Sequence, residues 1–250
     1  TACGAAYGGD PDEYRDACLM LADALEEDGN PGAGDAQRWI GLSHRSNGVI
    51  WPNADATLAV SNHQAHEWAL AAARPLGLLT GTPGTGKTYT VGAVVRELAA
   101  RIGEPSIATC APTGKAAVRL GESLRRVGVS IQPRTIHSLL EIGRNGHDGD
   151  GWGFQRNESN PLDERVVIVD EASMLDTDLA ASLFRACGPG AHVLLVGDPY
   201  QLPPVGHGAP LRDLIAAGVP RGHLSEIQRN AGLIVRACAA IKDGKHFDVC

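Results

Sequence analysis

Short apolar runs alternate with segments of helical periodicity from about residue 60 to the end of the chain. Runs of this kind, separated by segments with a period near 3.6, are typical of parallel strands joined by crossover helices. The pattern predicts an α/β fold in which a parallel sheet is flanked by helices. The predicted strands are 76–80, 106–111, 166–170, 192–197 and, more weakly, 223–227, and the predicted helices are 62–73, 87–102, 115–127, 178–187, 210–217 and 233–242.

The segment 143–160 interrupts this alternation. It is polar, rich in glycine and asparagine, and it contains Trp152 and Phe154. Such composition between regular elements is typical of turns and loops. We expect an inserted hairpin here, although an ordinary polar loop has the same composition.

The first part of the chain has a different pattern. Asp10 and Glu13 fit a capping box at the start of a helix, and Gly29 opens a glycine-rich break. We therefore predict a small helical segment over 1–57, ahead of a domain over 58–250.

Charge follows the same division. The chain of 250 residues has 22 basic and 29 acidic side chains and a net charge of -7. This balance argues against a protein that coats DNA. Residues 1–60 hold 10 acids and 3 bases, whereas 61–250 hold 19 of each. The excess acidity therefore belongs to the first segment, and the predicted domain is neutral.

Cysteines and hydropathy favour a cytoplasmic protein without a membrane partner. Six cysteines are scattered along the chain without a C-x-x-C pair, as is typical of buried thiols in a reducing cytosol. No apolar run approaches the length of a membrane span, and no secretory signal is evident.

The strongest motif lies between the first predicted strand and the helix that follows it. It reads Gly81, Thr82, Pro83, Gly84, Thr85, Gly86, Lys87, Thr88 and fits G-x-x-x-x-G-K-[ST]. Its glycines let backbone N–H groups surround a phosphate at a helix N-terminus. Lys87 would reach the β- and γ-phosphates, and the Thr88 hydroxyl would bind Mg²⁺. A glycine-rich turn without function is the alternative, and the flanking strand and helix disfavour it.

A pair of acids completes a hydrolytic site. Asp170 and Glu171 follow the apolar run 166–169 at the carboxyl end of a predicted strand, where open α/β sheets bind ligands. Asp170 can hold Mg²⁺ through water, and Glu171 can orient and deprotonate the attacking water. The sequence therefore predicts hydrolysis of a nucleoside triphosphate.

Four further motifs follow in order: CAPTGKAA at 110–117, TIHSLL at 135–140, DEASM at 170–174 and GDPYQLPPVG at 197–206. Over about 60–243 the chain resembles the RecD-like branch of superfamily 1 DNA helicases, relatives of the exodeoxyribonuclease V alpha subunit. The resemblance implies a P-loop NTPase with a RecA-like sheet, ATP and Mg²⁺ as cofactors, and 5′-to-3′ movement on single-stranded DNA.

The resemblance also implies roles around the nucleotide. Gln64 matches the glutamine that reads adenine, since its amide both donates and accepts hydrogen bonds. Gln201 matches the residue that senses the γ-phosphate. Arg229 matches an arginine on that phosphate. A solvent-facing helical glutamine and a surface arginine are the alternatives.

Other positions match the DNA contacts of the family. Pro112, Thr113, Gly114 and Lys115 would contact the DNA backbone from the start of a helix. Thr135 and His137 match a second DNA-contacting motif. Phe154 lies in the part of 143–160 that resembles the family's strand-separating hairpin, which implies contact with duplex junctions. The alternatives are a plain helix N-terminus and a core or capping histidine.

Superfamily 1 motors use two RecA-like domains, and the motifs here match the first alone. Because the chain starts at Thr1 and the later motifs have no counterpart, we expect a piece of a longer helicase whose second RecA-like domain follows. By itself such a piece should bind nucleotide weakly, hydrolyse little and not unwind. The open alternatives are a nucleotide-gated module that binds single-stranded DNA and a P-loop ATPase of unrelated role.

Overall fold

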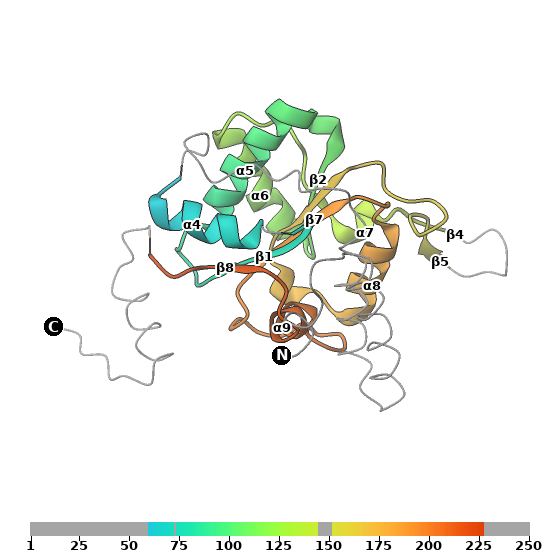
Figure 1. Ribbon diagram of the computed structural model, residues 1–250. Coiled ribbons are helices and arrows are strands. Elements are labelled where there is room, and N and C mark those ends of the chain that lie inside the picture. Colours follow the sequence, from blue (N-terminus) through green and yellow to red (C-terminus); the bar gives the residue numbers. More distant parts are fainter. Residues whose placement is uncertain (1–59, 73, 145–151, 228–250) are drawn as a thin grey trace, which may run out of the picture.

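The computed structural model describes residues 60–72, 74–144 and 152–227 (Figure 1). The predicted N-terminal segment 1–57, the predicted helix 233–242 and Arg229 lie outside the described residues. Within the described ranges, no helix combines the length and the apolar character that crossing a membrane requires.

Six parallel strands form the main sheet, in the order β3-β2-β6-β7-β1-β8. The strands are β1 (Leu76–Gly81), β2 (Ile107–Ala111), β3 (Arg134–Thr135), β6 (Val166–Val169), β7 (His192–Gly197) and β8 (Arg221–Leu224). All four residues of β6 are fully buried. Because helices cover both faces of a parallel sheet, its central strands are continuous apolar runs. The predicted fold class is confirmed.

Helices pack against both faces (Figure 1). They are α4 (Asn62–Ala71), α5 (Lys87–Ile102), α6 (Gly114–Arg126), α7 (Ile136–Leu139), α8 (Thr177–Ala186) and α9 (Pro210–Ala216), with 3₁₀ turns η1 (Glu104–Ser106) and η2 (Ala172–Met174). One buried cluster joins the sheet to α4, α5 and α6, and the other joins it to α7, α8 and α9. Alternate residues of each strand enter opposite clusters, as Ile168 and Val169 do.

Several predicted boundaries differ from the structure. The strand predicted over 106–111 begins at Ile107, because Ser106 belongs to η1. The strand predicted over 223–227 lies at Arg221–Leu224, where it pairs with β1. The elements β3 and α7 have no counterpart in the prediction, because both are too short to show periodicity.

A small antiparallel hairpin stands apart from the main sheet. It consists of β4 (Ile142–Arg144) and β5 (Trp152–Phe154), with Ile142 opposite Phe154. The predicted interruption over 143–160 therefore contains a hairpin, and its first strand begins one residue upstream, at Ile142. The residues between the two strands lie outside the described ranges.

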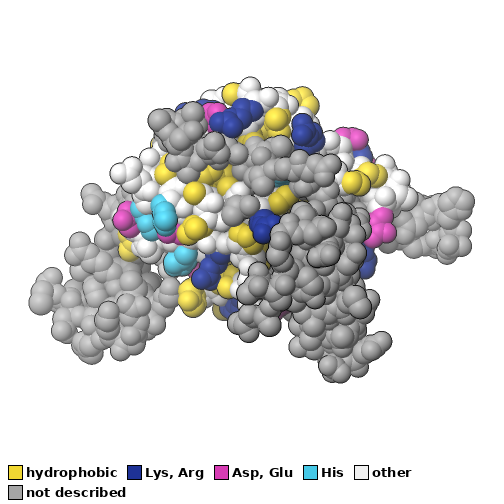
Figure 2. All heavy atoms as spheres, viewed as in Figure 1, with side chains coloured by type: hydrophobic (Ala, Val, Ile, Leu, Met, Phe, Trp, Pro, Cys, Tyr) yellow, Lys and Arg dark blue, Asp and Glu magenta, His cyan; other side chains and the backbone are white. Residues whose placement is uncertain are grey.

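Helix α4 lies directly on the backbone of β1 and β8. A Cβ atom at Gly77 would overlap the carbonyl oxygen of Ala71, and one at Gly222 would overlap that of Glu67. The Glu67 carboxylate also accepts the N–H of His223 at 2.6 Å. Figure 2 shows histidines beside an acidic side chain on the left of the molecule, the side on which α4 and β8 lie in Figure 1. This close approach fixes the position of α4 relative to β1 and β8.

Candidate active site

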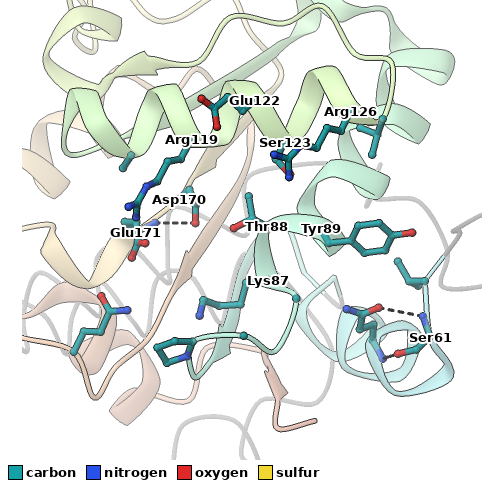
Figure 3. A pocket seen from close by; sticks show the side chains of 18 residues that line it. Ser61, Lys87, Thr88, Tyr89, Arg119, Glu122, Ser123, Arg126, Asp170 and Glu171 are labelled. Carbon is teal, nitrogen blue, oxygen red and sulfur yellow. Dashed lines mark hydrogen bonds between the residues drawn. The ribbon is translucent and has the colours of Figure 1, made fainter. Parts of the chain in front are cut away.

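A cavity of about 1080 Å³ opens at the carboxyl end of the sheet (Figure 3). The loop 81–88 joins β1 to α5, and Asp170 and Gln201 follow β6 and β7, the strands nearest to β1 on one side. The carboxyl ends of parallel strands meet at one edge, so residues distant in sequence converge here. Lys87, Thr88, Asp170, Glu171 and Gln201 all line this cavity.

The loop owes its shape to its glycines and to Thr85. Gly84 and Gly86 both have a φ of 88°, a conformation that L side chains rarely adopt. Thr85 is buried, and its hydroxyl donates to the carbonyl of Thr82 at 2.8 Å. The two glycines and this hydrogen bond therefore fix the conformation of the loop. Gly86 directly precedes the first residue of α5. A helix N-terminus beside such a loop is suited to binding phosphate.

The Lys87 ammonium lies against its own loop. Nζ donates to the carbonyl oxygens of Gly81 at 2.6 Å and Thr82 at 3.2 Å. Burial lowers the pKa of this ammonium, and the charges of Asp198, Glu171 and Asp170 oppose that shift. The lysine is thus held within the loop by backbone acceptors rather than by a carboxylate.

Asp170 is a buried carboxyl, with an exposed fraction of 6%. Burial raises its pKa to about 6, and the charge of Glu171 adds to this rise. Its Oδ1 accepts the N–H of Glu171 at 2.9 Å. Thr88 faces the same cavity. A desolvated carboxylate beside a hydroxyl fits a divalent cation, which would neutralise the charge that burial disfavours.

No group of three or more His, Cys, Asp or Glu side chains gathers as a metal site in the described part of the chain. Two protein ligands suffice for Mg²⁺ where phosphate oxygens and water supply the rest. The residues present therefore fit a cation that arrives with a nucleotide.

Glu171 has an unusual backbone. Its φ is 55°, in the left-handed region, and it precedes η2 as the N-cap residue. Its Oε2 is buried and has no hydrogen-bond partner among the residues that the structure describes. Strained conformations and unpaired buried polar atoms both concentrate at functional sites. Glu171 therefore brings a carboxylate with one unpartnered oxygen to the wall of the cavity.

Gln201 and Asp198 both follow β7, and Gln201 lines the cavity. The backbone N–H of Gln201 donates to the carbonyl of Asp198, and its own carbonyl accepts from Arg212 at 3.1 Å. Asp198 is 3% exposed and its Oδ1 accepts the N–H of Tyr200. The sequence analysis missed Asp198, although its position directly after an apolar strand is the same signal that identified Asp170.

Gln64 lies at the other end of the cavity, and its side-chain carbonyl oxygen already accepts a hydrogen bond. It is 3% exposed and lines the cavity, so the alternative of a solvent-facing glutamine is wrong. Its Oε1 accepts the N–H of Ser61 at 3.1 Å in a capping box at the start of α4. Tyr89 and Arg126 line the cavity as well, and sequence reasoning missed both.

The predicted DNA-contacting positions lie at the neighbouring edge of the sheet. Strand β2 pairs with β3 so that Ala111 is opposite Thr135, which brings 112–115 close to 135–137. A second cavity of about 450 Å³ lies there, lined by Gly114 and Thr135 among others. Of the predicted DNA-contacting residues, Gly114 and Thr135 line this groove, whereas Pro112, Thr113, Lys115 and His137 are not among its lining residues.

The individual side chains differ in what they offer. Thr113 and Thr135 cap α6 and α7 by accepting the N–H groups of Ala116 and Ser138. Lys115 is exposed. Thr113 therefore has the local role that the alternative of a plain helix N-terminus assigns to it, and Thr135 has the same role in α7.

His137 and Phe154 lie together. Their ring centroids are 5.8 Å apart and tilted by 55°. His137 is exposed, so the alternative of a core histidine is wrong. Phe154 is half-buried and packs against the hydrophobic core. This contact anchors the base of the hairpin to α7.

The loop, the two carboxylates and the strand order define a P-loop NTPase core. The AAA domain family matches residues 57–248, and the chain belongs to that family. Its sequence is 41% identical to the ATP-dependent RecD2 DNA helicase of Deinococcus radiodurans over 192 residues, 76% of this chain and 25% of that protein. It is 37% identical to the RecBCD enzyme subunit RecD of Mycolicibacterium smegmatis over 193 residues, 70% of this chain and 34% of that protein.

These matches confirm the resemblance to RecD-like helicases. The chain spans between a quarter and about a third of the length of these curated relatives. The fold is similar to that of the Pif1 helicase from Candida albicans, with a TM-score of 0.51, 24% identity, and coverage of 74% of this chain and 44% of that one.

Proposed function

We propose that this chain is the first ATPase domain of a 5′-to-3′ DNA helicase, in which ATP hydrolysis drives movement along single-stranded DNA. One observation carries this proposal. The cavity that contains Lys87, Asp170 and Glu171 lies next to the groove that contains Gly114 and Thr135, and helix α6 lines both. A motor needs such adjacency, because nucleotide and DNA must affect each other.

The chain's own residues account for the chemical roles. The N–H groups of the loop surround the phosphates, and Lys87 exchanges its carbonyl partners for phosphate oxygens. Thr88 and Asp170 would hold Mg²⁺, which supplies charge neutralisation at the phosphates when bound. Glu171 accepts the proton of the attacking water. Gln201, held by the turn after β7, is placed to sense the γ-phosphate.

At the base end of the cavity, Gln64 has its carbonyl engaged by Ser61 and offers mainly its amide N–H₂ group. This N–H₂ group is suited to donate a hydrogen bond to an acceptor atom on the edge of adenine. Arg229, which lies outside the described residues, is proposed as the arginine on the γ-phosphate.

DNA contacts are proposed for the neighbouring groove. Pro112, Thr113, Gly114, Lys115, Thr135 and His137 would bind the backbone of a single strand. The hairpin β4–β5 with Phe154 at its base would meet a duplex junction. A second RecA-like domain is the expected partner, and without it we expect weak nucleotide binding and little hydrolysis.

The chain offers a matched pair of variants as a test, because lysine is rare in it and two of its four lysines lie in the proposed sites. Lys87→Ala should abolish binding of a fluorescent ATP analogue and leave binding of labelled oligo-dT unchanged. Lys115→Ala should weaken binding of oligo-dT and leave nucleotide binding unchanged, since it removes one of several proposed backbone contacts. Fluorescence titrations measure both.

Unchanged nucleotide affinity in Lys87→Ala would refute the phosphate-loop assignment. In the protein expressed from the complete gene, single-stranded DNA should raise the hydrolysis rate. A rate indifferent to DNA would instead favour a P-loop ATPase of unrelated role.

A further inference from the structure

The hairpin β4–β5 needs support from the rest of the domain. A hairpin of two strands is marginally stable by itself in water, and each strand of this one has three residues. It is inserted between α7 and β6 and lies apart from the main sheet (Figure 1). Its orientation relative to the domain therefore depends on the contacts at its base.

Backbone hydrogen bonds continue the pairing of the hairpin down to the end of α7. The N–H of Gln155 donates to the carbonyl of Glu141 at 2.9 Å, and the N–H of Arg156 donates to that of Leu140 at 3.1 Å. Leu140 is the C-cap residue of α7 and is fully buried. The two chains of the hairpin thus leave the domain as a pair, and one of them starts from the core.

The Arg156 side chain joins three segments at this base. Its Nε donates to the Glu141 carboxylate, just after α7, at 3.1 Å. Its Nη1 donates to the carbonyl of Pro161 at 3.0 Å and to the Asp163 carboxylate at 3.4 Å, on the segment that returns to β6. A guanidinium carries its donors in a rigid planar fork, so it holds these acceptors in one defined geometry, which a flexible lysine does not.

The backbone is strained at the residue that Arg156 binds. Glu141 has a φ of 55°, in the left-handed region that residues other than glycine rarely adopt. Strain of this kind persists only where the surroundings fix the residue, and it is concentrated at functional sites. Here Gln155 binds the carbonyl of Glu141 and Arg156 binds its carboxylate. The returning chain of the hairpin therefore fixes the turn from α7 into β4.

These contacts act locally rather than on the stability of the domain. The Glu141 side chain is 48% exposed and that of Asp163 is 88% exposed, and exposed ion pairs stabilise a folded protein little. Phe154 makes a separate contact with His137 of α7. Without Arg156 this aromatic contact would remain, and the hairpin could pivot about it.

We propose that Arg156 is a positioning residue that holds the hairpin β4–β5 rigid against α7, so that a DNA duplex is opened against a fixed element. Helix α7 begins directly after Thr135, which lines the groove, and ends beside the base of the hairpin. One rigid unit would then join the groove to the hairpin. This inference rests on the proposed function, which places a duplex junction at the hairpin.

The test uses the protein expressed from the complete gene and a forked DNA duplex with one fluorescent strand. Arg156→Ala should lower the rate of unwinding by roughly tenfold, the scale of one lost charge-assisted contact. The kcat for ATP hydrolysis with oligo-dT and the Kd for oligo-dT should stay at their wild-type values, whereas a general loss of folding would change both. Arg156→Lys keeps the charge without the fork and should restore only part of the rate.

Hydrogen exchange tests the structural half of the inference without DNA. The amide protons at positions 155 and 156 bind the carbonyls of Glu141 and Leu140, so they should exchange faster in Arg156→Ala than in the wild type. The midpoint of thermal unfolding should stay close to that of the wild type, because the ion pairs lost are exposed.

Arg101→Ala is the matched control, since it removes an exposed ion pair with Glu97 on α5, far along the chain from the hairpin. It should behave as the wild type in every measurement. Unwinding at the wild-type rate in Arg156→Ala overturns the inference, and so does unchanged amide exchange. A fall in kcat by the same factor as the fall in unwinding also overturns it. Wild-type protein that hydrolyses ATP without opening the fork would instead refute the proposed function itself.

Discussion

Asp170 carries a negative charge that its surroundings disfavour. Burial and the neighbouring Glu171 raise its pKa to about 6. The ionised form therefore has a high free energy until a cation arrives, and part of the binding energy of a metal–nucleotide complex comes from relieving it. The same environment that prepares the site for Mg²⁺ makes the ligand-free protein less stable.

This yields a pH-dependent prediction for Asp170→Asn. Between about pH 4 and pH 6 the folded protein keeps a proton on Asp170 that the unfolded chain has lost, so the contribution of Asp170 to stability falls as pH rises through this window. At pH 7.5 without ligand, the variant should be more stable than the wild type by roughly 2–3 kcal/mol. This difference should shrink toward zero below about pH 4. Urea unfolding across this range measures it, and equal stability at pH 7.5 would contradict the buried, unpaired state of this carboxyl.

Among the individual residues of the site, the sequence predicts some and not others. Lys87, Asp170 and Glu171 follow from spacing within a strand–loop–helix unit, because local chain geometry places them. Arg119 and Tyr89 could not be found this way. They lie on helix faces, and which face meets the cavity depends on how α6 and α5 pack over the sheet.

Among the elements, the strands were predictable where both faces are buried. The short apolar runs of β6 and β7 are typical of strands buried on both faces. The observed bounds of β7 are the predicted ones. Strand β3 was not predicted, because it consists of two polar residues, Arg134 and Thr135. They form a strand only by pairing with β2. Pairing between strands, not composition, decides such short elements.

The contact of α4 with the sheet leads to a prediction for Gly222→Ala. Its Cβ would overlap the carbonyl oxygen of Glu67, so α4 must shift away from β8. We expect a loss of about 1–3 kcal/mol in unfolding free energy. Nucleotide affinity should fall too, because α4 carries Gln64. Urea denaturation and nucleotide titration measure the two effects.

Gly114→Ala serves as the control for this variant. A Cβ there meets nothing within 4 Å, and the residue is the first of α6. Alanine should leave stability unchanged or raise it slightly. If Gly222→Ala were as stable as this control, close packing of α4 would not be what positions Gln64.

For the whole molecule, ligand binding and folding are coupled. The nucleotide cavity draws residues from α4, α5, α6 and the loops after β6 and β7. A ligand there contacts most of the elements that cover one face of the sheet, so it can bind only the folded chain. The sequence predicted the sheet and several residues of this cavity, such as Lys87 and Asp170, but not the part that α6 contributes, because that part depends on how separate elements pack.

Mg²⁺ and ATP should therefore stabilise the whole chain. At a ligand concentration one hundred times Kd, the gain is about 2.7 kcal/mol, which corresponds to a rise in Tm of several degrees for a domain of this size. Thermal unfolding monitored by circular dichroism measures it. Lys87→Ala should show no such rise, and a rise that persists in that variant would place the ligand elsewhere.

The bonds from Lys87 to Gly81 and Thr82 have a consequence for how the site fills and empties. Before a phosphate arrives, two peptide oxygens accept hydrogen bonds from the ammonium. Nucleotide entry is then a ligand exchange, and the measured affinity reports the difference between two sets of oxygens. In the proposed reaction, the same two peptide oxygens are the acceptors to which the ammonium returns once product has left.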